Sequence, residues 1–133
     1  LLAAALALVE RKLPSEALFR VAAACGVLAA LGAAAAYFSG PHADEALRAL
    51  ALDDPAARGL VEAHALWGRV LFILTGILGA LSLLGLLQYL QEEIPPRWLR
   101  LTLALGYAAL VPLLAWASHL GGLVRHTEIR GFF

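Results

Sequence analysis

The stretch VLFILTGILGALSLLGLLQYLQ, residues 70–91, decides the fold because it contains no lysine, arginine, aspartate or glutamate. A helix needs about 20 apolar residues in a row to cross the hydrocarbon core of a bilayer. The stretch has that length, and it carries Gly76, Gly79 and Gly85. Small residues of this kind let membrane helices approach each other closely. The stretch therefore predicts a transmembrane helix that packs against other helices.

Two further stretches, Val21–Phe38 and Leu101–Val124, also lack charged residues. The 133 residues are 62% hydrophobic and 15% charged, whereas soluble domains are roughly 45–50% apolar and about 25% charged. The composition therefore predicts an integral membrane protein. The formal net charge is zero, which gives no indication of a nucleic-acid partner.

The first residues, LLAAALALV at positions 1–9, are apolar but cross only about half a bilayer at roughly 1.5 Å per residue. A signal-peptide core is the alternative interpretation, but it needs a basic region before it and a small-residue cleavage site after it. Here ERKLP follows. We therefore expect the tail of a first transmembrane helix that is only partly present in the chain. The predicted fold is all-α, a polytopic four-helix bundle forming one domain over residues 1–133.

Helix-breaking residues divide the chain. Ser39-Gly40-Pro41 is predicted to end the second helix, Asp54-Pro55 to cap and begin the third, and Pro95-Pro96 to form a turn before the fourth. A loop over residues 39–54 is expected to contain a short interfacial helix, Ala43–Leu52. The predicted helices cover residues 1–10, 16–38, 55–91 and 97–125.

Basic residues indicate the orientation of the chain. Short connectors rich in Lys and Arg mark the cytoplasmic side of a membrane, and on one side they hold Arg11, Lys12, Arg20, Arg97 and Arg100. We therefore expect a multi-pass protein of the bacterial inner membrane, with residues 39–69 and the C-terminus in the periplasm.

All four histidines fall on the predicted periplasmic side. His64 and His126 lie at equal sequence distance before and after Pro95, so straight helices would bring them to the same height. Two neutral histidines on facing helices are what an axially ligated b-type haem requires, and bundle cores are common places for such sites. The candidate cofactor-binding residues are His64, His119 and His126 as ligands, with Arg69 and Arg125 near the propionates.

Other uses of these side chains stay open. Histidines at a membrane interface often only hydrogen-bond a headgroup or a neighbouring helix. The three candidate ligands are equally candidates for zinc or copper, with His42 and Glu128 as further donors, although no local His-x3-His spacing is present. Gly68 and Gly121-Gly122 would leave room for a flat ring.

No motif indicates an enzyme or a transporter, and Cys25 is interpreted as a small hydrophobic residue.

Three features resemble the bacterial integral membrane family called domain of unknown function 2231. They are the closing motif Gly121-Gly122-Leu123-Val124-x-His126, the His-x3-Gly from His64 to Gly68, and a small-residue second helix that ends in a polar glycine loop. The resemblance covers nearly the whole chain and implies a four-helix membrane protein. The family's opening His-Pro…His-Phe-Pro motif is absent here, and Thr127 stands where the family often has glycine.

Members of that family resemble companions of cytochromes and other electron-transfer proteins. The sequence therefore predicts a small membrane subunit of a respiratory or photosynthetic electron-transfer assembly, with one b-type haem on the periplasmic side. The haem would exchange electrons with a quinol or a periplasmic cytochrome, because the other half of the bundle contains no histidine. The alternative is a cofactor-free accessory subunit that packs against partner proteins.

Overall fold

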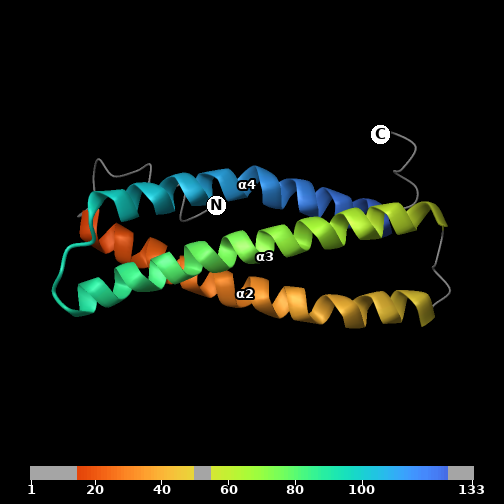
Figure 1. The fold of residues 1–133 in the computed structure, drawn as a ribbon, viewed down its shortest axis with the longest axis horizontal. Helices are drawn as coiled ribbons and strands as arrows, with labels where there is room; N and C mark the ends of the chain where they lie inside the picture. Colours follow the sequence, from red (N-terminus) through yellow and green to blue (C-terminus); the bar gives the residue numbers. More distant parts are fainter. Residues whose placement is uncertain (1–14, 50–54, 126–133) are drawn as a thin grey trace.

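The structure is a computed structural model that describes residues 15–49 and 55–125. In these ranges the chain forms three helices, α2 (Ser15–Ala49), α3 (Pro55–Leu90) and α4 (Arg97–Arg125), joined between α3 and α4 by a short turn (Figure 1). Each helix contains a stretch long and apolar enough to cross a membrane. The prediction of an all-helical, multi-pass membrane protein is confirmed at this level. The first helix, predicted over residues 1–10, lies outside the described residues.

Helix α3 lies in the middle of the bundle. It packs extensively against α2 and against α4, which lie on different sides of it (Figure 1). We call the end with the α3–α4 turn the turn end; it also holds the start of α2. The opposite end, with the start of α3 and the ends of α2 and α4, is the loop end.

Helix α2 is longer than the sequence predicts. It runs through Ser39-Gly40-Pro41 to Ala49, so the predicted loop and separate interfacial helix are wrong as far as residue 49, and residues 50–54 lie outside the described ranges. Two contacts accompany the continuation. The Ser39 hydroxyl donates to the Ala36 carbonyl at 3.0 Å, and local side-chain bonds of this kind help membrane helices to tolerate glycine and proline. The Tyr37 ring also stacks on Phe72 of α3, with centroids 4.6 Å apart.

The other boundaries agree closely with the prediction. Helix α3 begins at Pro55, where proline suits the first helical position. Helix α4 spans residues 97–125 as expected and continues through both Pro112 and the Gly121-Gly122 pair. The helical spacing of side chains around α4 therefore holds from the turn end to the loop end.

The turn after α3 has the hydrogen-bond pattern of a Schellman motif. The Glu92 amide donates to the Tyr89 carbonyl at 3.1 Å and the Glu93 amide donates to the Gln88 carbonyl at 2.9 Å. Glu92 adopts a φ of 62°, the left-handed conformation that this motif requires and that glycine usually supplies. A residue with a Cβ pays roughly 1–2 kcal/mol for that conformation.

Replacing Glu92 by glycine is therefore expected to raise the free energy of unfolding by about 1 kcal/mol, after the larger backbone entropy of glycine is subtracted. Glu93→Gly is the matched control and should lower the same free energy by roughly 0.5 kcal/mol. Denaturation in sodium dodecyl sulfate followed by circular dichroism measures both. Equal effects of the two substitutions would contradict a strained Glu92.

The outer surface of the bundle is apolar. Large side chains that are more than half exposed include Leu28 at 67% and Leu105 at 70%. The buried cluster is comparatively small and lies between α3 and α4, consisting of Leu71, Leu78, Leu99, Leu103, Leu110 and Ala117. Soluble monomers rarely expose so much continuous apolar surface. Lipid contact along the helices accounts for it.

Small residues bring α2 and α3 together near the middle of the bundle. A Cβ added to Gly79 of α3 would collide with the Ala30 methyl group of α2 and would stand 3.5 Å from the Gly26 carbonyl oxygen. At this level the Ser82 hydroxyl of α3 and the Tyr107 hydroxyl of α4 are hydrogen-bonded at 2.9 Å. The Tyr107 hydroxyl also occupies the space that a Cβ on Gly26 would need. All three helices therefore meet at one polar contact inside an apolar bundle.

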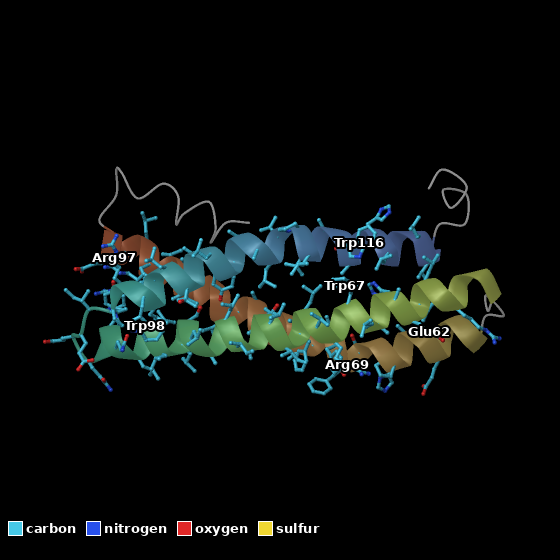
Figure 2. All side chains as sticks on the ribbon, turned by 45° about the horizontal axis from the view of Figure 1, so that its top comes forward. Glu62, Trp67, Arg69, Arg97, Trp98 and Trp116 are labelled. Carbon is cyan, nitrogen blue, oxygen red and sulfur yellow. The ribbon has the colours of Figure 1, made fainter. Side chains whose placement is uncertain are left out.

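Two tryptophans on α4 mark the expected positions of the membrane surfaces. Trp98 is 57% exposed near the turn end, and Trp116 is 49% exposed towards the loop end (Figure 2). At 1.5 Å per residue they lie about 27 Å apart along the helix, which is close to the thickness of the hydrocarbon core. Exposed tryptophan favours the membrane–water interface. The side chains beyond Trp116 are therefore expected at headgroup level.

Candidate functional site at the loop end

His64 forms a hydrogen bond from α3 to α4. Its Nδ1 lies 3.0 Å from the backbone carbonyl oxygen of Ala117. Because a carbonyl oxygen only accepts, Nδ1 must carry the hydrogen, and the lone pair of the neutral ring is then on Nε2. Histidines that bind metals commonly show this arrangement, in which the second nitrogen is fixed by a carbonyl group. The imidazole is thus oriented, and its Nε2 is chemically suited to act as a ligand.

Gly121 provides the space that this ring needs. A Cβ at position 121 would lie 3.0 Å from Cε1, 3.3 Å from Nδ1 and 3.6 Å from Nε2 of His64. The predicted role of the glycines is therefore only partly met, because the flat ring beside Gly121 is the His64 imidazole itself. Gly68, one turn along α3 from His64, and Gly122 both have open space where a Cβ would stand.

His119 lies at the same level as His64 but on another side of α4. Its ring is 5.9 Å from that of Trp116, which faces outward. Position 119 is about 200° around the helix from position 117, at 100° per residue, and position 117 is the one that meets His64. The structure therefore does not arrange His64 and His119 as a facing pair on two helices.

Of the two candidate arginines, the structure describes the side chain of Arg69 but not that of Arg125. Arg69 is exposed, and it stands about 140° around α3 from His64. Figure 2 shows Arg69 and Trp67 on different sides of that helix. Arg69 is thus not brought to the face of α3 that carries His64. Arg125 is the last residue of α4; its side chain and the whole of His126 lie outside the described part of the chain.

The contacts of His64 show its level along α4. Equal distances from Pro95 suggested that His64 is level with position 126, whereas its imidazole meets Ala117 and Gly121. The turn occupies residues 91–96, so its centre precedes Pro95. The expected match in height with His126 stays a prediction, because His126 lies outside the described residues.

A metal centre built from several side chains is not found in residues 15–49 and 55–125. Within them no three His, Cys, Asp or Glu side chains lie close enough to share an ion. His42 is exposed on α2, while Glu128 lies outside these ranges. The described chemistry of the loop end is therefore one oriented imidazole with an available lone pair.

Sequence reasoning missed two polar contacts that the helices create. The bond between Ser82 and Tyr107 has no local signal, since the two residues share no motif. At the turn end, the Arg20 guanidinium lies over the Tyr89 ring, 4.7 Å from its centroid. In the sequence, Arg20 and Arg100 indicate only the orientation of the chain in the membrane.

No protein-family model, no curated protein and no solved structure matches this chain.

Proposed function

We propose that the chain is a small membrane subunit of an electron-transfer assembly, in which His64 is an axial ligand of one b-type haem at the loop end. A haem bound there would supply one-electron chemistry close to a membrane surface. The role of this chain is to hold the iron through Nε2 of a single, fixed imidazole. A second ligand would come from His126 or from a partner protein, because His119 lies on another side of α4 from the one that meets His64.

The observation that supports this proposal most strongly is the bond between His64 Nδ1 and the Ala117 carbonyl. It fixes the tautomer, and it raises the basicity of the nitrogen that would bind iron. A Cβ added at Gly68, one turn from His64, or at Gly122 meets nothing within 4 Å. The predicted resemblance to domain of unknown function 2231 points in the same direction, and so does the predicted location in the bacterial inner membrane with the loop end in the periplasm.

A cofactor-free accessory subunit is the second candidate. It is favoured by the fit between His64 and Gly121, because an imidazole that fills a gap and bonds to the next helix already has a structural use. In that case the chain contributes apolar helices to a larger membrane complex. Its exposed leucines and tryptophans then contact lipids and partner subunits.

A visible absorption spectrum separates the two candidates. We expect the purified protein, supplied with haem and reduced with dithionite, to show the sharp bands of a six-coordinate b-type haem. His64→Ala should abolish these bands by removing the iron ligand. Loss of the bands in His126→Ala would identify His126 as the second ligand, whereas His119→Ala should keep them because His119 lies on another side of α4.

His42→Ala is the matched control, because His42 lies at the same end on α2 and is exposed. It should leave the spectrum unchanged. Circular dichroism of each variant checks that the helices remain folded. A folded wild-type protein without the bands, or bands that persist in His64→Ala, would contradict the haem proposal and leave the accessory subunit.

A further inference from the structure

The turn end of the bundle brings together two arginines from different helices. At Gly85 of α3, the Phe19 ring of α2 and the Leu99 side chain of α4 both lie within 3.6 Å of the position of an added Cβ. Arg20 and Arg100 each follow one of these contact residues in the sequence. The packing at Gly85 therefore draws the starts of α2 and α4 towards the same part of α3.

Tyr89, one turn beyond Gly85, lies against the Arg20 side chain. The Arg20 guanidinium is 4.7 Å from its ring centroid, and Arg100 and Glu16 are charged groups in its surroundings. Phe19 supports the ring from α2 at a centroid distance of 5.6 Å. The turn end thus holds two arginines and a carboxylate, Glu16, in the neighbourhood of one tyrosine.

The hydrogen-bonding capacity of this group is not fully used by the described residues. The Nε of Arg100 is buried and has no hydrogen-bond partner among them, and the same holds for Oε1 of Gln88, the neighbour of Tyr89 in the sequence. Buried polar atoms of folded proteins are nearly always paired. The Nε–H of Arg100 therefore needs an acceptor, and an anionic oxygen is the strongest kind of acceptor.

The depth of the pair in the membrane restricts what that acceptor is. Arg100 lies one half-turn from the exposed Trp98, about 3 Å towards the middle of the bundle. A long arginine side chain at this depth reaches the membrane interface, where the phospholipid phosphates are. Basic pockets between helices on the cytoplasmic side of a membrane bind anionic headgroups, and this is the side that the basic connectors predict for the turn end.

We propose that Arg20, Arg100 and Tyr89 form a binding site for the phosphate group of an anionic phospholipid. The phosphate accepts hydrogen bonds from both guanidinium groups and from the Tyr89 hydroxyl, while the acyl chains lie along the apolar surface of the helices. The site is at the opposite end of the bundle from His64, and it does not depend on whether a haem is bound.

The test is a titration of phosphatidylglycerol into the purified full chain in non-ionic detergent, with the melting temperature followed by tryptophan fluorescence. A ligand that binds the folded state raises this temperature. We expect stabilisation by phosphatidylglycerol at concentrations at least tenfold lower than for phosphatidylcholine, whose choline group repels the arginines. Inorganic phosphate is titrated separately. If it stabilises the protein as well as the lipid does, the source of the phosphate is soluble and the lipid proposal fails.

Arg20→Gln and Arg100→Gln should each weaken the response to phosphatidylglycerol by on the order of tenfold. Arg97→Gln is the matched control, because Arg97 is an exposed arginine one turn before Arg100 on the same helix. It should change the response less than twofold. Glu16→Gln removes the competing carboxylate and should strengthen binding.

Arg20 is exposed, so Arg20→Gln is expected to fold even if Arg100→Gln does not. If Arg97→Gln weakens the stabilisation by phosphatidylglycerol equally, the lipid recognises only the overall positive charge of the turn end. That result would overturn the proposed site. An unchanged response in Arg20→Gln would overturn it as well.

Discussion

Gly79→Leu is expected to separate α2 from α3 and to lower the free energy of unfolding by about 3 kcal/mol or more. Even a Cβ at this position collides with Ala30 and approaches the backbone of Gly26. Overpacking of a tight contact costs typically 1–3 kcal/mol when side chains can move. Here part of the obstacle is the backbone of α2, so whole helices must shift. In lipid, close contact between helices is a main source of their association.

Gly76→Leu is the control for this prediction. Gly76 lies one turn away on the same helix, and a Cβ there meets nothing within 4 Å. Its free energy of unfolding should change by no more than about 0.5 kcal/mol. Unfolding by sodium dodecyl sulfate, followed by circular dichroism, gives both values. Equal stability of the two leucine variants would show that α2 and α3 do not cross at Gly79.

Gly121→Leu is expected to displace the imidazole of His64 and to break its bond to the Ala117 carbonyl. The added Cβ would stand 3.0 Å from the Cε1 of that ring, and the exposed side chain of His64 can move away only by leaving α4. Loss of the bond should lower the free energy of unfolding by about 1 kcal/mol. The larger effect concerns the proposed haem, whose absorption bands should disappear because the ligand no longer has its fixed orientation.

Gly122→Leu is the corresponding control, since a Cβ at Gly122 meets nothing within 4 Å. The bands and the stability should both stay close to those of the wild type. Destabilisation of Gly121→Leu in a protein that binds no haem would favour the accessory subunit, in which His64 serves packing alone. Full stability of Gly121→Leu would contradict the contact between His64 and Gly121.

The helix boundaries with local signals could be predicted from the sequence. Pro55 starts α3 and Pro95-Pro96 separates α3 from α4, because proline restricts the backbone wherever it stands. The end of α2 could not be predicted in the same way. Ser39-Gly40-Pro41 carries a strong stop signal, yet the stacking of Tyr37 on Phe72 of another helix accompanies its continuation. Contacts between helices have no signature in the local sequence.

The sequence predicts the end of the bundle at which the candidate site lies, but not which face of each helix carries its side chains. The sequence places His64 and His119 towards the same end of the bundle. Which side of α4 faces α3 depends on how the helices rotate about their axes. In a helix that is apolar all round, hydrophobicity does not distinguish the buried face from the lipid-facing one. The sequence therefore could not show that His119 lies on a different side of α4 from the one that meets His64.

The central position of α3 also has a consequence for how the chain is made. Synthesis proceeds from the N-terminus, so α2 and α3 emerge before α4, and they already share the close crossing at Gly79. A stable helical hairpin of α2 and α3 can thus assemble in the membrane before α4 leaves the ribosome. Tyr107 then arrives with α4 and reaches both Ser82 and Gly26. Insertion of α4 would then place a tyrosine against two helices that are already paired.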